Sequence, residues 1–220
     1  MRRPRRRYTK KMNVIFATGN KDKMSEIREI LDGMHVIDTV QSMKEAGVDI
    51  DIEENGTTFE ENAMIKARAV YDAAVAKGMK DVLVLADDSG LCVEALNGEP
   101  GIYSARYMGK DTSYRIKNAN LIERVNKEGN GNRNAQFVCC IAAVFPDGTG
   151  KVVRGTIDGE IADKEYGENG FGFDPIFYVP RLGSTTAQLK PEEKHAISHR
   201  GNALRMMRKV IAEYESPDCK

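Results

Sequence analysis

Apolar residues recur along the chain with two spacings, one typical of strands and one typical of helices. Short apolar runs predict buried strands over 13–17 and 82–86, and a further strand is predicted over 35–40. Between these strands, apolar residues three or four positions apart predict two amphipathic helices, the first capped by Asn20. The apolar faces of the two helices consist of Met24, Ile27, Ile30 and Leu31, and of Phe59, Ala63, Ala67, Val70 and Ala74.

The start of the second helix carries a strong local signal. Thr57 and Thr58 precede the glutamates Glu60 and Glu61 by three positions each, so the sequence offers two overlapping capping boxes. Gly78 is placed to end this helix. The next predicted strand follows, and we expect it to stop at the acidic residues that come directly after its apolar run.

The second half of the chain contains longer strands. An apolar run of nine residues, 137–145, and the segment 151–161 predict two strands joined by a Pro-Asp-Gly turn. Helices are predicted over 112–127 and 203–214. Because strands and helices alternate, the pattern predicts an α/β fold, and no linker is clear enough to divide residues 12–216 into independent domains.

The net charge of the chain is zero, but the charge is unevenly distributed. Residues 1–11 hold five Arg and two Lys without an acid, a charge of +7, so the rest of the chain carries −7. A basic tail can bind nucleic acid or anionic lipid, but we expect residues 1–11 to be an unstructured extension outside the fold. The acidic body argues against a stable nucleic-acid complex.

The composition, with 41% hydrophobic and 30% charged residues, is that of a globular protein. The longest apolar run is about half of what a bilayer-spanning helix requires, and no apolar stretch with a cleavage site follows the basic N-terminus. The sequence therefore predicts neither a membrane span nor a secretory signal. The four cysteines form no CxxC pair and have no histidine at zinc-finger spacing. A cytoplasmic location fits these features best.

The segment Thr18–Lys23, with the sequence TGNKDK, lies where the first strand ends and the first helix begins. Free backbone N–H groups, the helix dipole and two lysines at such a turn favour binding of a polyphosphate. The segment matches neither GxxxxGK[ST] nor GxGxxG, which excludes a P-loop and a Rossmann turn. The alternative is an ordinary capped turn with solvated lysines.

Acidic residues gather in two predicted loops. Asp87-Asp88-Ser89-Gly90 follows the apolar run of the third strand, and Glu53 and Glu54 end the acidic loop before the second helix. Carboxylates held at strand ends suit a hard cation such as Mg²⁺, which takes few protein oxygens and keeps waters for substrate phosphates. The alternative is a set of solvated loop acids.

Two further segments have the residues to recognise a flat ring. In Phe171–Asp174, two aromatic residues flank a glycine and precede an acid, an arrangement that either stacks on a nucleobase or anchors a core. The segment Lys194–Gly201 holds lysine, histidine and arginine donors; Lys suits a phosphate, and Arg and His suit a carbonyl oxygen. A structural histidine near a helix start is the alternative for this second segment.

Five segments together resemble one family. They occur in the order TGNKDK, ADDSGL, PGIYSARY, FGFDPIF and KHAISHRG. With these motifs the chain resembles the inosine/xanthosine triphosphate pyrophosphatases over about residues 12–214. The basic tail is not part of the resemblance.

The resemblance implies an elongated, two-lobed α/β fold, with a long central mixed β-sheet flanked by helices and a nucleotide cleft between the lobes. It also implies a homodimer that uses Mg²⁺. Asp88 would be the general base and, with Glu53, a metal ligand, although Glu54 stands in nearly the same register. The residues implied to contact the substrate are Thr18, Gly19, Asn20, Lys21, Asp22, Lys23, Lys66, Ser89, Phe171, Gly172, Phe173, Asp174, Lys194, His199 and Arg200.

The implied reaction is hydrolysis of noncanonical purine nucleoside triphosphates (ITP, dITP and XTP) to the monophosphate and pyrophosphate, which removes them from the nucleotide pool. Two rivals stay open. A Maf-like pyrophosphatase would cleave the same bond in modified pyrimidine nucleotides, although the SHRG segment argues against it. A non-catalytic nucleotide-binding protein would not need Glu53 and Asp88 together with two phosphate-binding lysines.

Overall fold

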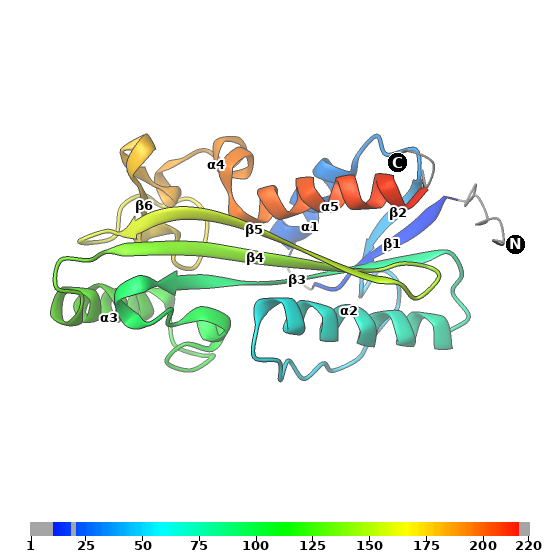
Figure 1. Ribbon diagram of the computed structural model, residues 1–220, viewed down its shortest axis with the longest axis horizontal. Helices are drawn as coiled ribbons and strands as arrows, with labels where there is room; N and C mark the ends of the chain where they lie inside the picture. The colour runs from blue at the N-terminus through cyan, green and yellow to red at the C-terminus, as the bar shows by residue number, and fades with distance from the viewer. Residues whose placement is uncertain (1–10, 19–20, 216–220) are drawn as a thin grey trace, which may run out of the picture. The chain divides into compact units, whose positions relative to one another are not determined.

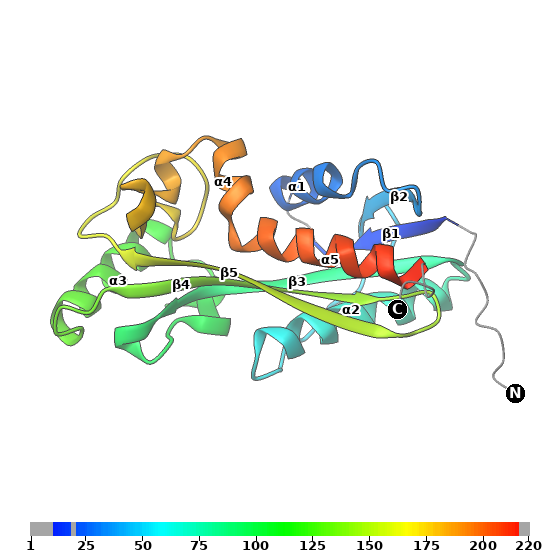
Figure 2. The ribbon, with the colours of Figure 1, turned by 45° about the horizontal axis from the view of Figure 1, so that its top comes forward.

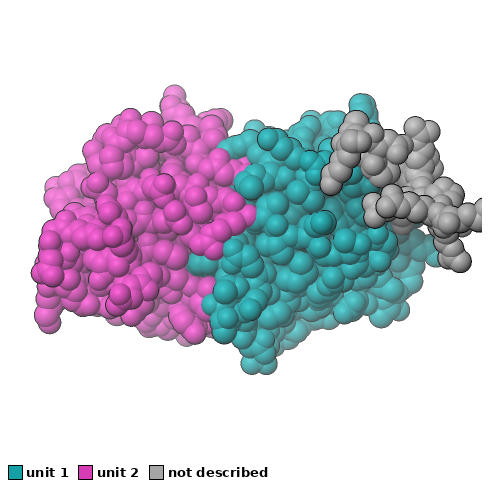
Figure 3. Space-filling view, viewed as in Figure 1, with its two compact units in different colours: residues 1–87, 140–153, 203–220 teal, residues 88–139, 154–202 magenta. Residues whose placement is uncertain are grey.

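The computed structural model of this chain describes residues 11–18 and 21–215. Their Cα positions divide into two compact units, and each unit is assembled from separate stretches of the chain (Figure 3). Unit 1 takes the residues up to 87, together with 140–153 and the residues from 203 onwards, and unit 2 takes 88–139 and 154–202.

In the described part of the chain, seven strands form a mixed sheet in the order β2-β1-β3-β4-β5-β6-β7. β1 pairs in parallel with β2 and β3, whereas β6 pairs antiparallel with β5 and β7. The strands are β1 (Met12–Phe16), β2 (Ile37–Ser42), β3 (Val82–Val93), β4 (Asn134–Val144), β5 (Gly150–Ile161), β6 (Phe177–Val179) and β7 (Ser184–Thr185). The helices are α1 (Lys21–Leu31), α2 (Phe59–Ala76), α3 (Tyr114–Glu128), α4 (Pro191–Ile197) and α5 (His199–Glu215).

In unit 1, helices cover both faces of the sheet. Helix α1 and the unit 1 part of α5 lie on one face, and α2 lies on the other (Figures 1 and 2). Arg208 of α5 donates a hydrogen bond to the carbonyl of Ile30, which joins the two helices on the shared face. The predicted apolar stripe of α2 is confirmed, because Ala63, Ala67 and Val70 are fully buried.

The N-cap of α2 is Thr58, one of the two threonines of the predicted capping boxes, whereas the Glu61 carboxylate bonds the preceding Thr57. The Thr58 hydroxyl accepts the N–H of Glu61 at 3.1 Å. The Glu61 carboxylate in turn accepts the backbone N–H and the hydroxyl of Thr57, at 2.7 and 2.9 Å. These hydrogen bonds, that of the Thr57 backbone above all, hold the pKa of Glu61 below its usual value. The cap therefore fixes the first turn of the helix that carries Lys66.

In unit 2, one apolar core lies beneath α3 and the strands that it covers. Leu121 and Val125 of α3 are buried against side chains of the sheet and of the segment after Gly172. The core also takes in Phe137 and Phe177, whose ring centroids lie 4.2 Å apart. Because this core reaches Phe173, the glycine-rich loop before it is tied to the folded body of the unit.

Strand β4 is buried along most of its length. Cys139 and Cys140 are adjacent, so their side chains point to opposite faces of the sheet, and both are fully buried. The cysteines within the described residues, Cys92, Cys139 and Cys140, form no disulfide. No helix among those residues combines the length and the apolar character that a membrane crossing requires.

The predicted α/β class is confirmed, as are the mixed sheet and its flanking helices. One boundary is wrong. The third strand does not stop at Ala86 but continues through Asp87 and Asp88 to Val93. The polar segment is carried in strand conformation because the apolar Leu91 and Val93 beyond it enter the core of unit 2. Asp88 therefore lies within the strand and not at its end.

The cap of α2 leads to a stability prediction. Thr58→Ala removes the acceptor for the Glu61 N–H and should lower the free energy of unfolding by about 1 kcal/mol, measured by urea denaturation. Thr58→Ser keeps the hydroxyl and should be close to wild type. Equal losses in both variants would mean that the hydroxyl does not cap the helix.

Candidate active site

Several of the predicted site residues belong to two groups of contacting side chains, one in each unit. In unit 1, the predicted Lys23 and Lys66 contact Asp87 and Glu54, the neighbours in sequence of the predicted acids Asp88 and Glu53, and we call these four residues the lysine–carboxylate cluster. In unit 2, Phe171, Asp174, Lys194 and Arg200 are joined in the same way, and we call them the aromatic–cation cluster.

The pair of Lys23 and Asp87 is the innermost part of the lysine–carboxylate cluster. The Lys23 ammonium lies 2.7 and 3.0 Å from the two carboxylate oxygens of Asp87. The side chain of Asp87 is 1% exposed and that of Lys23 is 20% exposed. The two meet because β3 runs parallel to β1, and α1, the element that follows β1 in the chain, carries Lys23 near its start.

Lys66 and Glu54 complete the cluster. The Lys66 ammonium lies 2.9 Å from a carboxylate oxygen of Glu54 and donates to the backbone carbonyl of Asp87 at 3.0 Å. Both lysines are therefore anchored on residue 87, one through its carboxylate and the other through its backbone. Both ammonium groups are thereby held by hydrogen bonds to the same residue.

The acidic loop reaches Lys66 because it is fastened to α2. The Gly56 N–H donates to the side-chain oxygen of Asn62 at 2.8 Å, and Asn62 is buried. A Cβ at residue 56 would lie 2.7 Å from the Cβ of Glu61, so only glycine fits against the helix. This attachment holds Glu54 half-buried beside Lys66, whereas Glu53 is exposed.

The predicted phosphate loop is only partly described. Gly19 and Asn20 lie outside the described residues, and for Lys21 and Asp22 the description covers the backbone alone. Thr18 is half-buried, and its N–H donates to the carbonyl of Phe16 at 2.8 Å.

In the aromatic–cation cluster, Asp174 is the internal anchor. Its carboxylate is 4% exposed and accepts the Phe171 N–H at 2.8 Å and the Lys194 ammonium at 2.6 Å. The other oxygen accepts the hydroxyl of Thr186 at 2.8 Å. With these three hydrogen bonds, the carboxylate positions the loop and Lys194.

Phe171 and Phe173 have different environments, although one glycine separates them. Phe173 is buried and meets the ring of Tyr114 edge-on, with centroids 5.2 Å apart. Phe171 is 45% exposed, and two cations lie near its ring: the Lys194 ammonium at 4.9 Å and the Arg200 guanidinium at 5.8 Å from the centroid. Phe173 is thus the core anchor, and Phe171 is the ring that can receive a ligand.

The histidine and arginine predicted as donors begin a helix. Helix α5 starts at His199, four residues earlier than the sequence indicates, so His199 and Arg200 lie in its first turn. The His199 ring stacks on Phe137, with centroids 4.8 Å apart and planes 16° apart. Arg200 is buried with 6% exposure, which limits the geometry of its guanidinium.

Asp88 and Ser89 lie in the middle of β3, and both are half-buried. The Asp88 carboxylate accepts the N–H of Ser89 at 3.0 Å. Within residues 11–18 and 21–215, no three His, Cys, Asp or Glu side chains gather into a ready-made metal site. A cation that takes one or two carboxylates and completes its shell with phosphates and water does not require such a group.

Two residues on α3 belong to the surroundings of Phe171–Asp174 but were not among the predicted ones. Asn118 and Tyr114 contact the loop that carries Phe171. The signal in the sequence was a polar residue on the inner face of a helix, one turn after an aromatic residue. Burial raises the pKa of the Tyr114 phenol, which is consistent with its place against this loop.

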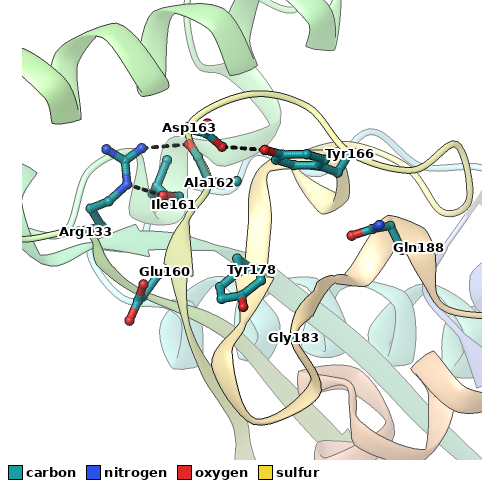
Figure 4. A pocket seen from close by; sticks show the side chains of 9 residues that line it. All are labelled: Arg133, Glu160, Ile161, Ala162, Asp163, Tyr166, Tyr178, Gly183 and Gln188. Carbon is teal, nitrogen blue, oxygen red and sulfur yellow. Dashed lines mark hydrogen bonds between the residues drawn. The ribbon is translucent and has the colours of Figure 1, made fainter.

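Unit 2 also has an open pocket of about 460 Å³ that is separate from these residues (Figure 4). Arg133 forms one wall, and its guanidinium is held by the carbonyls of Ile161 and Ala162. Tyr166 donates to Asp163, which follows Ala162 in the chain, at 2.9 Å. None of the predicted site residues lines this pocket, so its size does not indicate the site of the chemistry.

Comparison with known proteins places the chain among named relatives. The Ham1 family model matches residues 14–210. A dITP/XTP pyrophosphatase of Staphylococcus aureus strain MRSA252 is 49% identical over 200 residues, which cover 90% of this chain and 96% of that protein. A dITP/XTP pyrophosphatase of Clostridium perfringens is 44% identical over 88% of this chain and 94% of that protein. A solved HAM1 protein structure from Coxiella burnetii has a TM-score of 0.82 and 40% identity, with coverage of 92% and 99%.

The lysine–carboxylate cluster predicts that Asp87 acts on stability. Asp87→Asn leaves Lys23 facing a neutral amide at a 1% exposed position and should lower the free energy of unfolding by about 2 kcal/mol, measured by urea denaturation. Glu53→Gln, the corresponding change at an exposed acid, should alter it by less than about 0.5 kcal/mol. Equal effects would contradict a buried Lys23–Asp87 pair.

Proposed function

The chain belongs to the Ham1 family, and we propose that it is a nucleoside-triphosphate pyrophosphatase that hydrolyses ITP, dITP and XTP to the monophosphate and pyrophosphate. The supporting observation is that relatives of 49% and 44% identity, aligned over 90% and 88% of this chain, are named dITP/XTP pyrophosphatases. Unit 1 holds paired lysines suited to phosphates, and unit 2 holds an exposed ring beside cations suited to a base.

The phosphate-binding role is assigned to unit 1. Lys23 and Lys66 supply two ammonium groups held in place by residue 87, and α1 begins at Lys21 within the predicted phosphate segment Thr18–Lys23, so its first backbone N–H groups are assigned to the phosphates as well. A triphosphate carries several negative charges, and phosphoryl transfer depends mainly on positioning and on neutralising that charge. The lysine–carboxylate cluster has the residues for both tasks.

The metal is proposed to be Mg²⁺, held by Asp88 and by one acid of the loop before α2. Glu54 is favoured over Glu53, because it is half-buried beside Lys66 whereas Glu53 is exposed. Carboxylate oxygens are the ligand type that this hard cation prefers. When bound, it would neutralise charge on the phosphate oxygens, including charge that develops on the departing pyrophosphate.

The chemical step is assigned to Asp88. Asp88 is only half-buried, so its carboxylate can orient a water molecule toward the α-phosphorus and accept a proton from that water as it attacks. Ser89, the next residue, would contact the substrate. Asp87 is excluded from this role because its carboxylate is buried and bound to Lys23.

The base-binding role is assigned to unit 2. Phe171 offers an exposed face, and Lys194, His199 and Arg200 carry donors. Donors suit the 6-oxygen of hypoxanthine and xanthine, whereas adenine presents an amino group there. Such a mismatch leaves polar groups unpaired and can reject the wrong base by up to about 10⁴-fold. Guanine keeps the 6-oxygen, so its exclusion is assigned to the 2-amino group, which would lack an acceptor near Phe171–Asp174.

We further propose that the protein acts in the cytoplasm as a homodimer. The cytoplasmic assignment is supported by the reduced, buried Cys139 and Cys140 and by a sequence without a disulfide pattern. The homodimer is carried over from the family resemblance.

The activity is tested with a panel of nucleoside triphosphates and Mg²⁺, resolving pyrophosphate from orthophosphate. Pyrophosphate should be the first product, and kcat/KM for inosine and xanthosine triphosphates should exceed that for adenosine and guanosine triphosphates by at least about 10²-fold. Orthophosphate as first product would contradict the reaction, and a preference for pyrimidines would favour a Maf-like enzyme.

Asp88→Asn should lower kcat by about 10²-fold or more while keeping the fold.

The metal assignment is tested by a pair of neighbouring variants. Glu54→Gln should raise the Mg²⁺ concentration for half-maximal activity by at least about tenfold, because an amide is a weaker ligand for a hard cation. Glu53→Gln makes the same chemical change one residue earlier and should leave it within about twofold. A larger increase of the Mg²⁺ requirement in Glu53→Gln than in Glu54→Gln would assign the metal ligand to Glu53.

A further inference from the structure

Asn118 is a buried polar residue on α3 whose side chain reaches the loop that carries Phe171. It is 1% exposed, and its amide nitrogen donates to the Glu165 carboxylate at 2.7 Å and to the Gly172 carbonyl at 3.3 Å. Both partners are acceptors, so the amide must direct its NH₂ group toward them. Asn118 thereby bridges two points of the segment 165–172.

Only one of the two polar atoms of the Asn118 side chain is hydrogen-bonded within the described residues. Among the described residues, its side-chain oxygen has no hydrogen-bond partner, although it is buried. A buried acceptor without a partner is destabilising, and an apolar residue of similar volume would avoid that cost. What the Asn118 side chain contributes is the geometry that its two hydrogen bonds impose on the loop.

The geometry concerns Gly172. Its backbone has a φ of +69°, in the left-handed region, and its Cα faces the ring of Tyr114, which a Cβ would approach to 3.4 Å. Tyr114 lies one turn before Asn118 on α3 and also packs edge-on against Phe173. Helix α3 therefore holds the peptide between Gly172 and Phe173 from one side, through a hydrogen bond and an aromatic contact.

The same loop is held from its other side by Asp174, which accepts the Phe171 N–H and the Lys194 ammonium. Phe171 lies between the two attachments, and its ring is 45% exposed. Loss of either attachment would free the backbone that aims this ring.

We propose that Asn118 is a positioning residue for purine binding: it fixes the Gly172 carbonyl so that Phe171 faces the base. This inference rests on the proposed function, since it requires that Phe171 contact the base of the substrate. Asn118 itself touches neither the substrate nor the phosphates, so its loss should act on substrate affinity rather than on the chemical step.

The test is steady-state kinetics of the full chain with inosine triphosphate. Asn118→Asp keeps the volume but replaces the donor with a carboxylate that repels Glu165 and the Gly172 carbonyl. KM should rise by at least about tenfold, with kcat within about threefold of wild type. Asn118→Leu, which adds no charge and is less disruptive to folding, should raise KM in the same direction.

Two further variants separate positioning from general damage. Asn126→Asp makes the same change on the same helix, at an exposed side chain that accepts a hydrogen bond from Arg133, and should match wild type. Adding Glu165→Gln to Asn118→Asp supplies a donor opposite the new carboxylate and should recover part of the lost affinity. The same addition to Asn118→Leu should recover nothing.

The outcomes are distinguishable. An unchanged KM in both Asn118 variants would overturn the inference, as would a fall in kcat at constant KM, which is the mark of a smaller folded fraction. Absence of pyrophosphate release by the wild-type protein would instead overturn the proposed function. A rise in KM that Glu165→Gln reverses only in the aspartate variant supports the positioning role.

Discussion

Adjacent residues of a β-strand point to opposite faces of the sheet, and this constraint gives Asp87 and Asp88 different tasks. Asp87 faces inward with 1% exposure and binds Lys23, while its carbonyl binds Lys66. Asp88 keeps access to solvent. One strand thus carries, in consecutive positions, a carboxylate bound in an ion pair and the carboxylate to which we assign the chemical step. Asp87 holds Lys23 and Lys66 in place, and the proposed chemistry depends on Asp88.

The predictable part of the fold is the part that follows from local periodicity. The stripe of α2, its cap at Thr58 and the parallel strand β1 each have a signal within a few neighbouring residues. The end of β3 has no such local signal. The strand continues to Val93 because Leu91 and Val93 pack in a core whose other residues come from distant segments. The short strands β6 and β7 have too few residues to show a period.

The candidate site was predictable as a set of residue types and much less as a set of roles. The motif FGFD indicates a ring site, but only burial distinguishes Phe171 from Phe173. Glu53 and Glu54 are equivalent in the sequence, and the attachment of Gly56 to Asn62 decides which one approaches Lys66. The role of Asn118 could not be predicted from the sequence, since its hydrogen-bond partners lie 47 and 54 residues further along the chain.

The vicinal cysteines of β4 have a practical consequence. Their thiols point to opposite faces and are both fully buried, so a thiol reagent reaches neither while the strand is covered. Burial also raises the pKa of the partly exposed Cys92, which keeps it largely in the unreactive thiol form. The rate at which Cys139 and Cys140 are modified therefore measures how often the sheet opens, and the protein carries its own reporter of that motion without an introduced label.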